Sequence, residues 1–565
     1  MQKLTVSAIT LLLFAGVCQA QPTSEFSASG SRYAVASVQP LATEAAMEVF
    51  REGGNAVDAA VTAALTLSVV DNHNSGIGGG CLILVRTPDG KLIAIDGRET
   101  APAAAHRDMY LVDGEADSTL SQTGPLASGT PGALAAYAML VEQAGSKPLA
   151  RLLEPGMRHA RDGFHVDKNY ATRLKSAAKT IARFPGSKAQ LLKENGEPYQ
   201  EGELLVQPDL AKTYQGVIES GPDWFYRGPL AKAVGDWMAE NGGVLTAEDF
   251  AAYEAKAREP VVSTYRGLTV VGFPPPSSGG VHVAQMLNML EGFKLGEIMR
   301  RDHNEAVHLI AEAMKLAFAD RAHWLGDSDF AKVPRGLASK SYADSLASKI
   351  NLGKSTPVPS HGEPPEWRQD LFGRHTTHVT AADAEGYWVA ITATVNTGFG
   401  SKVIVPGTGV VLNNEMDDFS IHPGTPNAFG LIGAENNSVQ PGKRPLSSMS
   451  PTIVLDENGE PLLTVGAAGG PRIITQVLLA ITGVVDGGMT LAEAIAQPRW
   501  HHQWRPDKVG VEKTTAPEVV DSLSERGHLV ETLKAAGVSQ GIQRSAEGGL
   551  IAVRDPRVAG RAAAE

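Results

Sequence analysis

The 565-residue chain is poor in cysteine, which excludes a fold held together by several disulfide bonds. Its two cysteines are Cys18 and Cys81, and Cys18 falls within the first twenty residues. If those residues are removed on export, Cys81 has no partner in the chain. The sequence therefore predicts a protein whose stability does not depend on an intrachain disulfide.

Long apolar runs are also absent once the first twenty residues are passed, since no later run approaches the ~20 residues of a membrane-spanning helix. The chain starts with Met1-Gln2-Lys3, continues with the apolar residues 4–17 and reaches the small residue Ala20. This pattern predicts a cleaved signal peptide over residues 1–20 and a periplasmic or secreted mature protein without a membrane span. A lipoprotein signal acylated on Cys18 and a retained anchor are the alternatives; Val17 fits the first poorly.

The chain has no block of lysine or arginine, and its formal net charge is −12. Nucleic acids and anionic membranes are therefore not expected as main partners, because binding them needs clustered cations. The content of 43% hydrophobic and 20% charged residues is that of a globular protein with one large or two medium cores.

Metal and nucleotide signatures are missing as well. His375 with His378, and His501 with His502, are joined by no HExxH pattern and no cysteine cluster, so no metal site is expected. Residues 76–80 are rich in glycine but lack both the GxGxxG spacing and the GK[ST] ending. We expect a close-packed turn there and no nucleotide cofactor.

Apolar periodicity and turn residues predict an α+β fold in which strand hairpins alternate with helices. Residues 21–31 are small and polar, and a flexible lead is expected there. The predicted helices cover residues 43–52, 56–69, 132–145, 303–325 and 491–497, and Asn55 is expected to cap the second of them. The predicted hairpins join 82–85 to 92–95 and 451–456 to 461–466.

The segment RHTTHVT, residues 374–380, carries the clearest indication of chemistry. It follows residues 357–373, a loop rich in proline, glycine and charge, and we expect the whole stretch 357–375 to be flexible. Cleavage between His375 and Thr376 would leave a threonine at a new chain N-terminus. Such a residue holds a hydroxyl nucleophile and an amine that acts as its base.

A hairpin after the proposed cleavage site brings further groups to Thr376. If residues 376–382 and 387–397 pair around the turn at 383–386, Thr394 falls opposite Thr376 or within one residue of it. Asn396 then shares a face with Thr394, because side chains alternate along a strand. The alternative is that these threonines are simply good strand formers.

Motifs along nearly the whole chain resemble those of the γ-glutamyltranspeptidases, which are N-terminal-nucleophile (Ntn) hydrolases. They are GGNAVDAA (53–60), SGIGGG (75–80), TTH (376–378), LNNEMDDFS (412–420), RPLSSMSPT (444–452), GG (469–470) and PRWHH (498–502). The resemblance implies a four-layer αββα sandwich and self-cleavage into associated large (21–375) and small (376–565) subunits. It also implies transfer of γ-glutamyl groups, without a cofactor, from glutathione and similar compounds to water, amino acids or dipeptides.

The resemblance also implies roles for individual residues. Thr376 is the nucleophile, which cleaves the bond after His375 and is positioned by Thr394, while Gly469 and Gly470 form the oxyanion hole. The substrate residues are Arg98 for the α-carboxylate, Asp418 for the α-amino group, Glu415 and Asn396 assisting it, and Ser447 and Ser448 as a second carboxylate-binding pair. Phe429, in the lid-like loop 423–430, stands where the bacterial pattern has tyrosine.

Each of these residues has a simpler interpretation when taken alone. Arg98 could be a surface arginine, Asp418 a cap, and the two glycines a tight turn.

Two other functions are compatible with the sequence. One is a glutaryl or cephalosporin acylase of the same superfamily, and the other is a non-catalytic amino-acid-binding relative that never cleaves itself. Asp418 favours γ-glutamyl substrates because it calls for a substrate ammonium group. The intact Thr376 and Thr394 argue against the non-catalytic relative.

Overall fold

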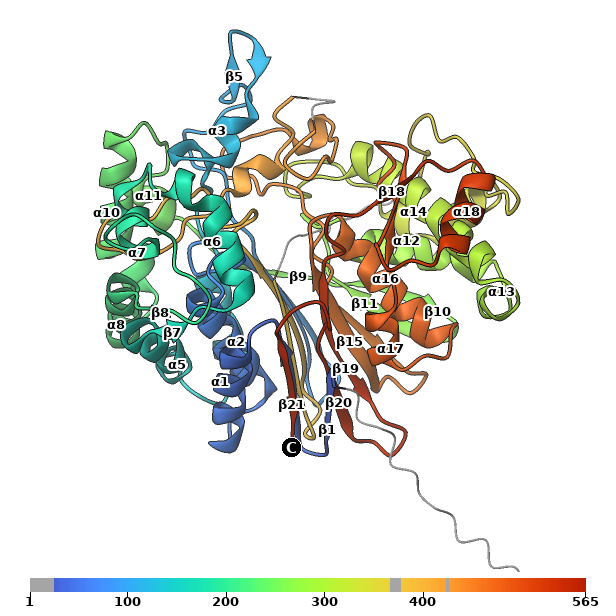
Figure 1. The fold of residues 1–565 in the computed structure, drawn as a ribbon, viewed down its shortest axis with the longest axis horizontal. Helices are drawn as coiled ribbons and strands as arrows, with labels where there is room; N and C mark the ends of the chain where they lie inside the picture. Colours follow the sequence, from blue (N-terminus) through green and yellow to red (C-terminus); the bar gives the residue numbers. More distant parts are fainter. Residues whose placement is uncertain (1–24, 366–376, 423–425) are drawn as a thin grey trace, which may run out of the picture.

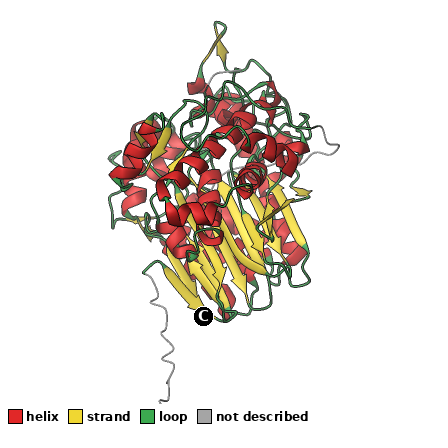
Figure 2. Ribbon diagram, turned by 90° about the vertical axis from the view of Figure 1, so that its right-hand side faces the viewer, coloured by secondary structure: helices red, strands yellow, loops and turns green. Residues whose placement is uncertain are grey.

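The computed structural model describes residues 25–365, 377–422 and 426–565. Two seven-stranded sheets pack face to face at the centre, and helices cover the outer face of each sheet (Figure 1). The strands of each sheet lie side by side in the view of Figure 2. This arrangement confirms the αββα sandwich and the α+β class that the sequence analysis expected.

Every neighbouring pair of strands in both large sheets is antiparallel. The first sheet has the order β1 (Ser27–Gly30), β20 (Leu550–Val553), β19 (Val538–Arg544), β15 (Pro461–Ala468), β14 (Thr452–Leu455), β11 (Leu268–Gly272), β10 (Val261–Tyr265). The second has the order β21 (Arg561–Ala564), β2 (Tyr33–Ser37), β12 (His378–Asp383), β13 (Trp388–Thr394), β3 (Gly80–Arg86), β4 (Leu92–Gly97), β9 (Lys256–Arg258).

Both sheets combine strands from before and after residue 376. In the second sheet, β2 lies between β21 and β12, and β13 pairs with β3. In the first, β1 pairs with β20 and β11 pairs with β14. The two parts of the chain therefore share each sheet through continuous backbone pairing.

The second sheet is covered by helices that come early in the chain, and the first by later ones (Figure 1). The early layer contains α1 (Pro40–Arg51), α2 (Ala56–Val70), α4 (Ala133–Ala144), α5 (Leu149–Asp162) and α8 (Pro208–Ser220). The later layer contains α12 (Gly279–Glu291), α14 (His303–Trp324), α16 (Arg472–Val485) and α17 (Leu491–Ala496). Further helices are α6 (Lys168–Ile181), α10 (Pro229–Glu240), α15 (Lys340–Ala347) and α18 (Pro517–Glu525).

The five predicted helices are all present, with bounds that differ by a few residues from those expected. Asn55 caps α2 as predicted. Its side chain accepts from the Asp58 amide at 3.0 Å, and the Asn55 amide donates to the Asp58 carboxylate at 2.9 Å. This reciprocal capping box satisfies two amides that a helix start leaves open. Every residue of α2 is buried, because the helix lies between α1, α5 and the second sheet.

The flexible lead predicted for residues 21–31 is wrong from Ser27 onward, where β1 pairs with β20. The amides of Ser31, Arg32 and Tyr33 then donate to the carbonyl of Glu565 at 3.0, 2.7 and 3.1 Å. Backbone pairing to a sheet edge needs no apolar pattern, which is why small polar residues gave no signal.

The described part of the loop before the proposed cleavage site, residues 357–365, has no helix or strand. Trp504 donates to the Val358 carbonyl at 2.8 Å, and the Gly362 amide donates to Asp320 at 2.7 Å. Across the described residues, no helix combines the length and the apolarity that crossing a bilayer requires.

Candidate functional site

The hairpin of β12 and β13 carries the candidate catalytic threonines at its open end. His378 pairs with Thr392, and Thr377 and Ala393 exchange two backbone hydrogen bonds before β12 begins. His375 and Thr376 lie outside the described residues. The predicted pairing of the two strands is therefore confirmed as far as Thr377.

Thr394 ends β13, where it pairs with Gly80 of β3. Its hydroxyl accepts from the Asn396 amide at 2.7 Å, and the Asn396 side chain donates to the Asn414 carbonyl at 2.9 Å. A Cβ on Gly79 would overlap the Thr394 carbonyl, so the glycine run at 76–80 is the close-packed turn that the sequence predicts. The glycines let two backbone segments approach at the position of Thr394.

Arg98 lies fully buried among three carboxylates just beyond β4. Its guanidinium donates to Glu99 at 3.0 Å, to Asp418 at 3.0 Å and to Glu415. Glu415 and Asp418 come from a single turn of 3₁₀ helix, η3 (Glu415–Asp418), so this segment holds both acids against the arginine. Burial raises the pKa of Glu415 well above its ordinary value, and the charge of Arg98 opposes this shift.

Several polar atoms of this cluster are buried and bonded to none of the described groups. They are Arg98 Nε, which is a donor, and Glu415 Oε2 and Asn396 Oδ1, which are acceptors. Buried polar atoms normally have partners, so such orphans call for an explanation. An amino-acid head offers a carboxylate for the donor and an ammonium group for the acceptors.

Ser447 and Ser448 are joined to the same region through Arg321 of α14. Arg321 donates to the Ser447 carbonyl and to the Ser448 hydroxyl, both at 3.3 Å, and to the Ser278 hydroxyl at 3.0 Å. Arg321 also shares a small cavity of about 10 Å³ with Asp418. Burial lowers the pKa of Arg321 to about 10, which leaves it cationic at neutral pH.

Arg321 was not among the residues predicted from the sequence. In the sequence it stands out only as an arginine within a predicted helix. In the structure, residues 306 to 321 of that helix are all buried, and charged side chains are rare in such positions unless they are paired.

A cavity of about 610 Å³ opens beside Gly469 and Gly470, and Thr377, Asn396 and Phe429 also line it. The two glycines lie between β15 and α16, with φ of 135° and 62°, values that side chains disfavour. Among the described residues, no acceptor is bonded to either glycine amide. Both N–H groups are therefore free to donate hydrogen bonds to an oxyanion, as an oxyanion hole requires.

The described part of the lid-like loop lies over these glycines. A Cβ on Gly470 would come within 2.7 Å of the Phe429 ring. The loop is held by two acids: the Ala428 amide donates to Asp417 at 2.9 Å, and the Asn427 side chain donates to Asp418 at 3.1 Å. Asp418 thus connects the loop to the arginine cluster; residues 423–425 lie outside the described residues.

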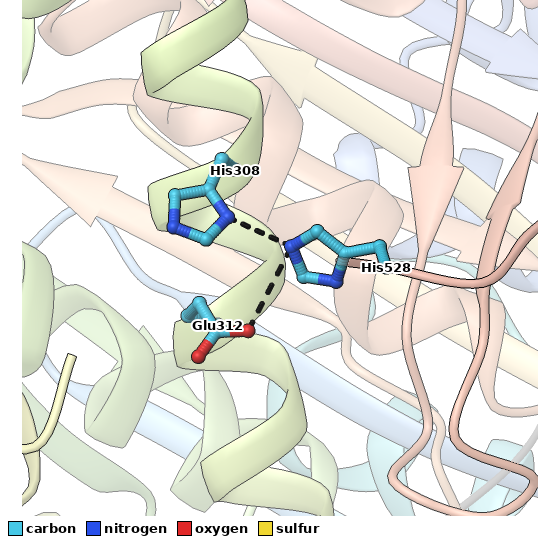
Figure 3. A group of neighbouring side chains, drawn as sticks. All are labelled: His308, Glu312 and His528. Atoms are coloured by element: carbon cyan, nitrogen blue, oxygen red, sulfur yellow. Dashed lines mark hydrogen bonds and ion pairs between the residues drawn. The ribbon is translucent and has the colours of Figure 1, made fainter. Parts of the chain in front are cut away.

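A group with potential metal ligands lies apart from this site. It consists of His308 and Glu312, one turn apart on α14, and His528, which follows α18 (Figure 3). His308 Nδ1 and His528 Nε2 are 2.7 Å apart, and His308 Nε2 is 2.8 Å from the Asn351 carbonyl. One proton between the two rings and one on His308 Nε2 satisfy this arrangement.

Glu312 of this group already forms an ion pair with Lys315 at 2.6 Å, so a cation would have to displace that pair. The histidine pairs considered from sequence have other partners. His378 is 3.1 Å from Thr392, His501 contacts Thr475 and Gln503, and His502 is 3.1 Å from Asp507.

Asp71, on the wall of the wide cavity, should make stability depend on pH. Burial raises its pKa from 3.8 to about 8, and its immediate neighbours are Asn74, His73, Asp167 and Arg173. Because the folded-state pKa is the higher one, folded protein loses stability as pH rises from about 4 through 8. We expect Asp71→Asn to gain stability over wild type at pH 9 relative to pH 5, with a difference in free energy of unfolding of about 1 kcal/mol or more. Calorimetry at both pH values checks this, and a gap that does not change with pH would contradict it.

Comparisons with known proteins agree with this geometry. Residues 42–565 match the family described as Gamma-glutamyltranspeptidase. The chain is 44% identical over 526 residues to the glutathione hydrolase proenzyme of Escherichia coli (strain K12), covering 93% of this chain and 90% of that protein. It is 38% identical over 546 residues to the acylase ACY 1 proenzyme of Pseudomonas sp. (strain SE83), covering 94% and 92%.

Among solved structures, the cephalosporin acylase from Bacillus halodurans superposes with a TM-score of 0.85 at 28% identity, covering 98% of this chain and 99% of that one. The γ-glutamyltranspeptidase of Helicobacter pylori gives a TM-score of 0.56 at 38% identity, covering 57% and 92%.

Proposed function

Because the chain belongs to the γ-glutamyltranspeptidase family, we propose that it cleaves itself between His375 and Thr376 and then acts through Thr376. It is an enzyme that hydrolyses glutathione and transfers γ-glutamyl groups. Its acceptors are water, amino acids and dipeptides. Residues 21–375 form the large subunit and 376–565 the small one, after export directed by residues 1–20.

The strand register supports Thr376 as the nucleophile. If the pairing that joins Thr377 to Ala393 continues by one residue, Thr376 falls opposite Thr394. Directly opposed side chains have Cβ atoms about 4.5–5.5 Å apart, so the two hydroxyls then lie within hydrogen-bonding reach. Thr394 is fully buried, and the neighbouring Asn396 amide fixes its hydroxyl.

The orphaned atoms around Arg98 are the observation that carries the choice of substrate. A substrate carboxylate accepts a hydrogen bond from Arg98 Nε. A substrate ammonium group donates to Glu415 Oε2, Asn396 Oδ1 and the Asp418 carboxylate. Binding then exchanges the internal pair of Arg98 and Asp418 for two pairs with a zwitterion, so no buried charge is left alone. This orientation directs the γ-carbonyl toward the glycine pair.

The reaction follows from these positions. The Thr376 hydroxyl attacks the γ-carbonyl while its own α-amino group takes the proton, and the Gly469 and Gly470 amides stabilise the oxyanion. Collapse breaks the C–N bond, and the leaving amine receives the proton. Water or an acceptor amine then attacks the γ-glutamyl ester and restores Thr376. Self-cleavage uses the same hydroxyl on the carbonyl of His375.

A glutaryl or cephalosporin acylase is the second candidate, favoured by the acylase fold match and the identity to acylase ACY 1. A glutaryl group lacks the ammonium that Asp418 and Glu415 are placed to bind. We therefore expect the purified enzyme to hydrolyse γ-glutamyl-p-nitroanilide at least tenfold faster than glutaryl-p-nitroanilide, because the two differ only in the ammonium group.

Asp418→Asn should lower kcat/KM for the γ-glutamyl anilide by about 100-fold, since a charge-assisted contact of about 2–3 kcal/mol is lost. The glutaryl anilide is the matched control, and its hydrolysis should change much less. Faster hydrolysis of the glutaryl anilide by the wild-type enzyme would favour the acylase instead.

A further inference from the structure

Arg472, the first residue of α16, lies two residues after Gly470 and lines the same wide cavity. Within the described part of the chain, its guanidinium forms no hydrogen bond or ion pair, and its Nε is buried without a partner. Arg557, on the same cavity wall, shows the usual situation: it pairs with Glu512 at 2.7 Å and with Asp555 at 3.2 Å.

Arg472 is partly buried, and taking a cation even partly out of water without an anion is unfavourable, so proteins usually pair such a charge. Burial lowers the pKa of Arg472, and no carboxylate offsets this effect. The group still stays charged at neutral pH, because an arginine pKa starts above 12. An anion that enters the cavity therefore removes a cost that the folded protein otherwise carries.

The position of Arg472 indicates which part of a substrate it meets. The amino-acid head is held by Arg98 and Asp418, and the scissile carbonyl lies at Gly469 and Gly470. The departing or arriving amine must then occupy the remaining space, the wide cavity that Arg472 lines. A volume of about 610 Å³ is in the range of small-molecule sites and holds an amino acid or dipeptide.

We propose that Arg472 binds the terminal carboxylate on the amine side of the reaction, which is that of the leaving peptide and of the accepting amino acid or dipeptide. The planar guanidinium matches a carboxylate through two parallel hydrogen bonds. Arg472 thus selects donors and acceptors that carry a carboxylate beyond the γ-amide. This inference rests on the proposed function, because it divides the same site into a head side and an amine side.

The test compares glutathione with glutathione whose terminal carboxylate is an amide, in the wild type, Arg472→Lys and Arg472→Gln. We expect the wild type to prefer the carboxylate form. The ratio of the two kcat/KM values should fall at least tenfold in Arg472→Gln and less in Arg472→Lys, which keeps the charge but not the planar fork. A ratio within one variant cancels differences in folded fraction.

Arg173→Gln is the matched control, because Arg173 lines the same cavity but is exposed. Its ratio should stay within about twofold of wild type. An unchanged ratio in Arg472→Gln, or an equal fall in Arg173→Gln, would overturn the assignment; the latter would indicate attraction by the general positive potential. Failure of the wild type to cleave either form would instead count against γ-glutamyl chemistry itself.

Discussion

Replacing Thr376 with alanine is expected to leave one uncleaved chain without measurable γ-glutamyl transfer. The substitution removes the hydroxyl for both self-cleavage and acyl transfer, and loss of a nucleophile in comparable hydrolases costs on the order of 10⁴–10⁶-fold in kcat. Intact mass spectrometry with N-terminal sequencing checks the result. The wild type should give two fragments, which begin at residues 21 and 376.

Two further variants serve as controls for this experiment. Thr376→Ser keeps a hydroxyl and should still yield two fragments, more slowly or with lower activity. Thr377→Ala changes the next residue, which pairs through its backbone, and should also be cleaved. Two fragments from Thr376→Ala would show that another group cleaves the chain. A wild type that stays uncleaved would favour the alternative of a non-catalytic amino-acid-binding protein.

Replacing Arg98 with methionine should be the most damaging change in the substrate pocket. It leaves Glu99, Glu415 and Asp418 buried without their shared cation, and breaking a buried pair by removing one partner typically costs about 3–5 kcal/mol. We expect this loss in chemical denaturation and a fall of at least about 100-fold in kcat/KM, because the carboxylate of the substrate also loses its partner.

Glu415→Gln is the control for stability in the same cluster. Glutamine keeps the size of this side chain and an oxygen acceptor for Arg98, and burial already disfavours the Glu415 charge that the change removes. Its free energy of unfolding should stay within about 1 kcal/mol of wild type. An Arg98→Met protein as stable as Glu415→Gln would contradict the charge balance proposed for this pocket.

Local signals in the sequence were sufficient for much of the fold. The capped α2 and the hairpin of β12 and β13 depend on residues close together in the chain, and both were predicted nearly to the residue. The register of that hairpin, counted outward from its turn, also placed Thr394 opposite Thr376 or within one residue of it. Assignment of Arg98 and Asp418 needed the resemblance to a family, since neither stands out in its local sequence.

The features that were missed depend on contacts between distant residues. Arg321 contacts Ser448, which lies 127 positions later in the sequence, and His308 contacts His528, which lies 220 positions later. β1 was missed because its partner β20 lies at the other end of the chain and its own residues show no strand pattern. No window of sequence contains both halves of such a contact.

Because both sheets combine strands from the two sides of residue 376, the proposed cleavage would change how the protein refolds. While the chain is whole, β2 reaches its place between β12 and β21 as an intramolecular event. Once it is cut, an unfolded enzyme consists of two separate polymers, and regaining β2 between β12 and β21 requires an encounter whose rate depends on concentration. Maturation by this cleavage would therefore remove the covalent connection that makes assembly intramolecular. If the chain is cleaved as proposed, we expect the mature enzyme to persist because it unfolds slowly, since refolding from two chains is slow at low concentration.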